Sequence, residues 1–189
     1  SGADYMVYFS QIEQAKKGIY FFKDFFTSEP QSVGVLNPFW SLVGIFARIF
    51  NLSSFVALHL ASFLLIPVFL IAGYHLISFF FEDKTKRKVC FIFFIFASGI
   101  GGWIMSILEA HSLENIYFPS LDVGEAFSLT TLSNPSHFIA SLTLLILIFL
   151  FSLYFFERYK FVYSFLASFC AFLLFSFHPY HVYTVFFVI

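Results

Sequence analysis

The sequence predicts an all-α fold, in which a polytopic transmembrane helix bundle carries two amphipathic juxtamembrane helices in its first extracytoplasmic loop. Two observations support this prediction. Hydrophobic residues make up 60% of the 189 residues and charged residues only 11%, whereas a soluble domain has about a quarter of its residues charged. Apolar stretches of about 20 residues, the length that crosses a bilayer, also recur along the chain between short polar turns.

Residues 1–52 are predicted to form the extracytoplasmic loop with its two interfacial helices. Within residues 3–17, aromatic and aliphatic side chains recur at helical spacing among polar ones, and Gly18 is a stop signal. Asn37 is a good capping residue and Pro38 suits the first helical position, so a second helix is predicted to begin there. Both helices are expected to lie along the outer membrane surface, with a loop between them.

Residues 53–189 are predicted to form the transmembrane domain. A span needs about 20 apolar residues, and four stretches come close to this length, at about 53–81, 89–108, 137–156 and 161–177. We expect a fifth element to start at about residue 182. The chain does not begin with methionine, and it stops inside an apolar run. We therefore expect it to be a fragment of a longer protein, truncated at both ends.

The basic residues predict the orientation of this bundle. Lysines and arginines gather in the turns at 82–88 and 157–160, and such turns face the cytoplasm. The segment 109–136 has no lysine or arginine and is expected to face outward, with its acids Glu109, Glu114, Asp122 and Glu125. The prediction is a multi-pass protein of the cell (inner) membrane, with an active face that is extracytoplasmic.

Two acids on this outer face are candidate catalytic residues. Asp4 suits the first turn of a helix, where the helix dipole favours an anion, and it could equally act as a general base toward a hydroxyl group. Glu29 is either a solvated acid in the loop or a residue that binds a metal ion or the substrate. Two carboxylates could together hold a divalent cation, Mg²⁺ or Mn²⁺, although no ligand spacing in the chain demands a metal.

Three histidines on the same face are candidate substrate-binding residues. His178 and His181 belong to the sequence HPYH at the end of the fourth span, and the helix should stop at about His178 because a proline follows. His137 begins the third span, where Asn134 or Ser136 could cap the helix. Their imidazoles could donate hydrogen bonds to an anionic group such as a phosphate. The alternative is ordinary packing at the membrane interface.

The pattern as a whole resembles bacterial polytopic proteins of the GT-C glycosyltransferase superfamily. The resemblance rests on the acid-headed amphipathic helix, the loop FFTSEP, the second helix NPFWSLVGIFARIFNLS, a span with LHLASFLL, and the segments SNPSHF and HPYH. It implies transfer of a sugar, with inversion, from a polyprenyl-phosphate-linked donor to an acceptor hydroxyl in the cell envelope. It further implies that Asp4 is the base, that Glu29 places the acceptor or a metal, and that His178 contacts the donor phosphate.

A second interpretation is a non-catalytic membrane protein, either a transporter or flippase, or a structural assembly component. Transporters place ionisable groups near the middle of the bilayer, whereas the acids of this chain stay in its loops. This placement favours chemistry at the membrane surface. The expected partners are the lipid bilayer and the lipid-linked donor. The net charge of −1 gives no case for binding nucleic acid.

Overall fold

The computed structural model describes residues 2–31, 33–97 and 128–188, and this part of the chain is mostly helical. The second half of the predicted span at 89–108 lies outside the described residues. So do the four acids of the predicted outward segment, at 109, 114, 122 and 125.

The first helix, α1, runs from Gly2 to Lys16 and ends where its sequence predicts. Gly18 has φ +84°, a left-handed conformation that glycine adopts without steric cost and that commonly closes a helix. The turn is fixed by two backbone bonds, in which the N–H groups of Gly18 and Ile19 donate to the carbonyls of Ala15 and Gln14 at 2.9 and 3.0 Å.

The second helix, α2, runs from Pro38 to Ile49 and confirms the predicted start. The side-chain oxygen of Asn37 accepts a hydrogen bond from the Trp40 N–H at 3.2 Å, as an N-cap does. Between α1 and α2, where a loop was expected, two short strands pair antiparallel. These are β1 (Phe21–Phe22) and β2 (Val35–Leu36), with Phe21 opposite Leu36 and Phe22 opposite Val35.

The two N-terminal helices pack closely against each other and against the start of α3 (Ser54–Phe80). Gly44 on α2 is the point of closest approach, because a Cβ atom there would overlap the side chain of Ala15. The buried core of this junction comprises Ile12, Ala15, Phe22, Trp40, Val43, Ala47, Ala57 and Leu58. The N-terminal region is therefore anchored to the helices that follow.

The remaining elements alternate in direction. Asp83 caps α4 (Lys84–Phe96), since its side chain accepts from the Lys86 N–H at 2.8 Å. A short helix, α7 (Ser128–Ser133), precedes the long helix α8 (Ser136–Arg158). The left-handed Tyr159 turns the chain into α9 (Phe161–Phe177), and α10 (His181–Val188) follows.

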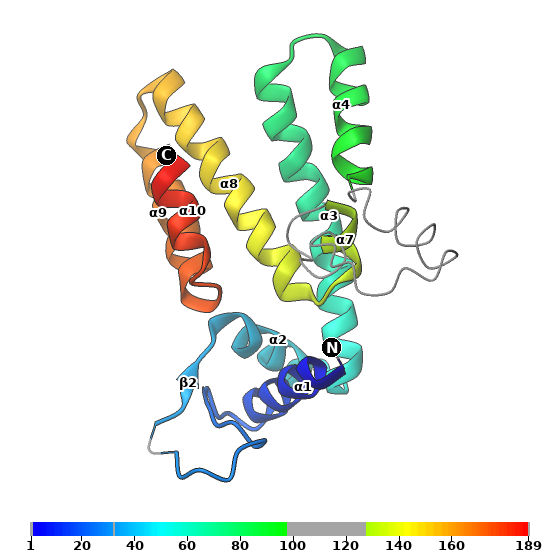
Figure 1. Ribbon diagram of the computed structural model, residues 1–189, viewed down its shortest axis with the longest axis vertical. Coiled ribbons are helices and arrows are strands. Elements are labelled where there is room, and N and C mark those ends of the chain that lie inside the picture. The colour runs from blue at the N-terminus through cyan, green and yellow to red at the C-terminus, as the bar shows by residue number, and fades with distance from the viewer. Residues whose placement is uncertain (1, 32, 98–127, 189) are drawn as a thin grey trace, which may run out of the picture.

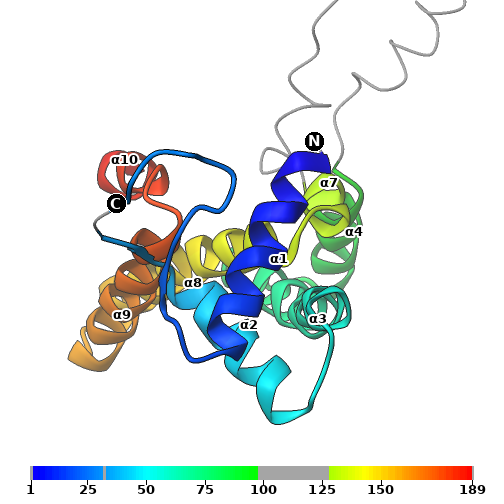
Figure 2. The ribbon, with the colours of Figure 1, turned by 90° about the horizontal axis from the view of Figure 1, so that it is seen from below.

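Figure 1 shows α3, α8 and α9 rising from one end of the molecule, with α1 and α2 lying across that end. Figure 2, seen from below, shows α1 and α2 in front of the ends of the other helices. The turns that join α3 to α4 and α8 to α9 lie at the opposite end (Figure 1). These turns hold six of the ten lysines and arginines, and the other four belong to the N-terminal region, at Lys16, Lys17, Lys23 and Arg48.

Two of the described helices, α3 and α8, are long and apolar enough to cross a membrane, which indicates association with a membrane. At 1.5 Å per residue, the 27 and 23 residues of these helices give about 40 and 35 Å, more than the roughly 30 Å of a hydrocarbon core. Helix α9 has the predicted bounds but only 17 residues, about 25 Å. Helix α4 has 13 residues.

Candidate functional site

His137 enters the interior at the start of α8. The helix begins after Pro135, which takes the N-cap position with φ −54° and ψ 148° and makes no side-chain capping bond. The N-cap position therefore belongs to Pro135, and not to Asn134 or Ser136 as expected, because Ser136 is already helical. One residue further, the His137 side chain is only 7% exposed.

His178 and His181 lie at the turn between α9 and α10. Helix α9 stops at His178, as the following proline predicts, and the His178 N–H still donates to the Leu174 carbonyl at 2.8 Å. The chain then folds back at once, so that the rings of His178 and His181 lie 5.1 Å apart between centroids. His178 is buried, with 5% of its surface exposed.

The antiparallel pairing of α8 and α9 brings the two histidine segments together. The rings of His137 and His178 meet edge to face, with centroids 5.8 Å apart. The three histidines predicted as substrate-binding residues thus share one place at the end of the bundle, on the side of α1 and α2.

Helices α1 and α2 complete this place with two aromatic residues. The Tyr8 hydroxyl and His137 Nε2 are joined by a long hydrogen bond of 3.5 Å. Trp40 stacks on Tyr8 at 4.9 Å, and its ring lies 5.5 Å from that of His137. We call Tyr8, Trp40, His137, His178 and His181 the histidine–aromatic cluster.

Sequence reasoning missed Tyr8 and Trp40 as members of the site. Tyr8 belongs to the apolar stripe of α1 and Trp40 follows the cap of α2, and neither position suggests a binding role by itself. One signal was available, because Tyr8 lies one helical turn after Asp4, and positions four apart share a helix face.

Burial sets the charge of the cluster. Burial, with a smaller contribution from neighbouring His181, lowers the pKa of His178 from 6.5 to about 4. Burial also lowers the pKa of His181. Both imidazoles are therefore neutral at pH 7, and a neutral imidazole donates one hydrogen bond and accepts another. A bound anion would raise these pKa values, because an opposite charge favours the protonated form.

The two candidate catalytic acids, Asp4 and Glu29, differ in their position relative to this cluster. Asp4 lies in the first turn of α1, one turn before Tyr8, and its side chain is outside the described part of the structure. Glu29 is exposed in the loop between the strands, where its N–H donates to Thr27 Oγ1 at 3.2 Å. No described contact joins Glu29 to the histidine–aromatic cluster, so its catalytic role stays a prediction.

The residues present do not make a metal site in the part of the chain that the structure describes. That part holds no group of three or more histidine, cysteine or acidic side chains placed to bind an ion. The cluster offers imidazoles and aromatic rings without a carboxylate, whereas Mg²⁺ and Mn²⁺ prefer oxygen ligands.

An apolar groove of about 300 Å³ adjoins the histidine–aromatic cluster. Phe39 and Phe177 separate the two, since Phe39 lies against Trp40 at 4.8 Å and against Phe177 at 5.4 Å. Beyond this pair the groove follows α8, past Ala140, Leu144 and Leu147, between walls from α2, α3 and α9. The cluster and the groove are therefore neighbours, with the rings of Phe39 and Phe177 between them.

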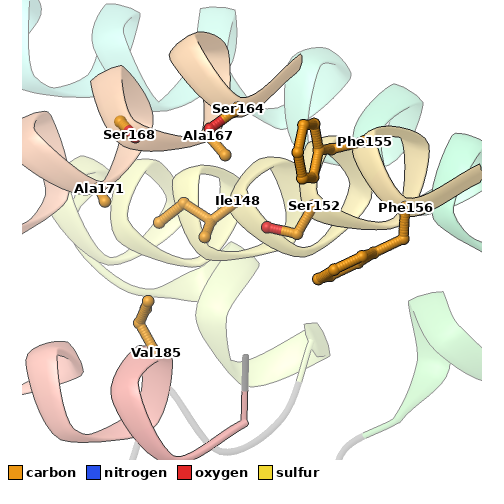
Figure 3. Close-up of a pocket in the computed structure, with 9 residues that line it drawn as sticks. All are labelled: Ile148, Ser152, Phe155, Phe156, Ser164, Ala167, Ser168, Ala171 and Val185. Carbon is orange, nitrogen blue, oxygen red and sulfur yellow. The ribbon is translucent and has the colours of Figure 1, made fainter. Parts of the chain in front are cut away.

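A second cavity, of about 270 Å³, lies between α8, α9 and α10. Figure 3 shows its lining, in which Ser152, Ser164 and Ser168 lie among apolar side chains such as Ile148 and Phe155. None of the candidate site residues lines it.

Comparison with known proteins adds no family to this picture. No protein-family model, curated protein or solved structure matches the chain.

Proposed function

We propose that this chain belongs to an integral membrane glycosyltransferase that takes a sugar from a polyprenyl-phosphate-linked donor and transfers it to an acceptor at the outer membrane face. The observation that supports this proposal best is the meeting of His137, His178 and His181 next to an apolar groove, from which only Phe39 and Phe177 separate them. A lipid-linked phosphate needs these two environments side by side, hydrogen-bond donors for the phosphate and an apolar surface for the chain.

The exposure of the long helices supports a place in the membrane. Only 22% of the most apolar part of α3, and 44% of that of α8, is buried inside the protein. Large apolar side chains face outward, among them Phe63 (69% exposed), Phe165 (70%) and Phe172 (69%). Soluble proteins rarely expose contiguous apolar surface on this scale, so we assign these faces to lipid.

The two ends of the bundle support the proposed orientation. The basic turns lie at one end, and α1, α2 and the histidine–aromatic cluster lie at the other (Figure 1). Basic turns face the cytoplasm, so the cluster faces outward. Helices α1 and α2 then lie at the outer surface, as proposed for juxtamembrane helices of the first extracytoplasmic loop.

The proposed reaction is a single displacement with inversion at the anomeric carbon. The Asp4 carboxylate removes the proton of the acceptor hydroxyl as its oxygen forms a bond to that carbon. The bond between the anomeric carbon and the phosphate oxygen breaks, and polyprenyl phosphate leaves with the electron pair. Neutral His178 and His137 donate hydrogen bonds to the phosphate, where negative charge develops. Glu29 positions the acceptor.

The test is sugar transfer by the full-length protein in lipid nanodiscs, with a panel of radiolabelled polyprenyl-phosphate sugars. We expect Asp4→Asn to lower kcat by 10²–10⁴-fold, the range for loss of a general base, and to leave the KM for the donor nearly unchanged. His178→Asn should raise the donor KM several-fold. Glu157→Gln, at the exposed far end of α8, is the matched carboxylate control.

Equal turnover by Asp4→Asn and wild type would remove Asp4 from the mechanism. Transport of the lipid across the bilayer, without transfer from any donor in the panel, would instead establish the flippase interpretation.

A further inference from the structure

A separate cavity of about 230 Å³ lies between α1 and the strand pair. From α1 it is lined by Val7, Ser10 and Gln11, which share one helix face because they lie three and four residues apart. The lining does not include Tyr8, which belongs to the histidine–aromatic cluster, or Ile12, which belongs to the core. The cavity is therefore distinct from the proposed catalytic site.

The wall opposite α1 is held by two glutamine side chains. The Gln14 amide donates to the Lys23 carbonyl and accepts from the Lys23 N–H, both at 2.9 Å. The Gln31 amide likewise donates to the Asp24 carbonyl at 2.6 Å and accepts from the Asp24 N–H at 2.8 Å. Because these bonds fix Lys23 and Asp24 in place, the pocket is formed before a ligand arrives, which lowers the entropic cost of binding.

Two residues that line the pocket carry polar groups with unused hydrogen-bonding capacity. The Gln11 side-chain oxygen is buried and has no hydrogen-bond partner in the described part of the chain. Ser10 Oγ accepts from Gln14 Nε2 at 3.2 Å, which leaves its own proton to donate. A buried carbonyl without a partner costs about 1–3 kcal/mol, so the site favours an occupant that brings a donor.

We propose that this pocket binds a single uncharged sugar ring. A ring hydroxyl both donates and accepts, which matches the adjacent Gln11 oxygen and Ser10 hydroxyl. Phe22 and Phe26 supply apolar surface for the C–H face of the ring. The two charged residues of the lining, Lys23 and Asp24, have opposite signs, so the lining carries no net charge. The volume is below the roughly 300–1,000 Å³ of pockets for drug-sized ligands, which fits one ring.

The sugar belongs to the acceptor glycan, an assignment that rests on the proposed glycosyltransferase function. The binding itself does not depend on transfer. The two proposals can therefore fail separately.

The test uses the full-length protein in nanodiscs and saturation-transfer NMR with the methyl glycosides of glucose, galactose, mannose and N-acetylglucosamine. Glycylglycine is the zwitterionic comparison. We expect at least one glycoside to bind, and Gln11→Met, which keeps the length of the side chain and removes its amide, to weaken binding at least tenfold. Ser10→Ala provides a milder second variant, with a loss of several-fold.

His178→Asn is the control, because it alters the proposed donor site and should leave glycoside binding unchanged. Three outcomes would overturn the proposal: no glycoside binds, so that the pocket holds water only; glycylglycine binds as well as the glycosides; or Gln11→Met and Ser10→Ala bind like wild type. Asp4→Asn tests the other proposal, since it should slow transfer by 10²–10⁴-fold and retain glycoside binding.

Discussion

His178 links the stability of the protein to pH at the scale of a single residue. Its pKa is about 4 in the folded protein, against an ordinary value of 6.5. Between these two values the unfolded chain binds more protons than the folded one, so the free energy of unfolding falls as the pH falls. Above pH 6.5 both states are neutral at this position, and the effect disappears.

We expect the free energy of unfolding to drop by up to roughly 3 kcal/mol between pH 6.5 and pH 4, at about 1.4 kcal/mol per pKa unit. The measurement is denaturant unfolding in detergent micelles at a series of pH values. His178→Asn should flatten the slope, because asparagine does not titrate. Identical slopes for His178→Asn and wild type would contradict this account.

At the scale of elements, the contact between α1 and α2 depends on a single missing side chain. A Cβ atom at Gly44 would overlap Ala15 and lie 3.0 Å from the Ile12 carbonyl oxygen. Both neighbours belong to a rigid helix, and Ile12 and Ala15 are completely buried. The two helices would have to separate to make room, and the histidine–aromatic cluster would lose the alignment of Tyr8 with Trp40.

Gly44→Ala should therefore destabilise the protein by about 1–3 kcal/mol, the usual cost of overpacking. The helix propensity of alanine alone would have the opposite sign, with a gain of about 1 kcal/mol, so the direction of the change decides between the two effects. Thermal unfolding measures it, and Ile49→Ala, at a site 71% exposed, is the control. Unchanged or increased stability of Gly44→Ala would refute the close contact.

Some of these elements could be predicted from the sequence alone and others could not. The start of α2 and the ends of α1 and α9 were predictable, because Asn37, Gly18 and Pro179 act locally. The strand pair was not, since it is only two residues long on each side and is held by Gln14 from another element. Periodicity likewise cannot tell that Tyr8 and Trp40 contact His137, because a core and a binding site use the same aromatic stripe.

At the scale of the whole molecule, the arrangement predicts which regions face the same side of the membrane. The loop between β1 and β2 lies at the end of α1 and α2, whereas the α3–α4 and α8–α9 turns lie at the other (Figure 1). A bundle in a membrane must keep these two ends on opposite sides.

Single cysteines test this arrangement in intact cells with a membrane-impermeant maleimide, after Cys90 and Cys170 are replaced by alanine. Thr27→Cys should be labelled from outside. Lys86→Cys and Lys160→Cys should be labelled only after permeabilisation. Labelling of all three from one side would rule out the proposed orientation, and with it the outward-facing site.

The hydrogen bond between Tyr8 and His137 joins residues 129 positions apart, and this separation constrains biosynthesis. A ribosome adds about 5–20 residues per second, so about 6 to 26 seconds pass between the synthesis of the two partners. During that interval the nascent N-terminal helices lack the imidazole on which they finally dock. We conclude that the packing of the N-terminal helices against His137 is a late event, which can be completed only after the ribosome has synthesised His137.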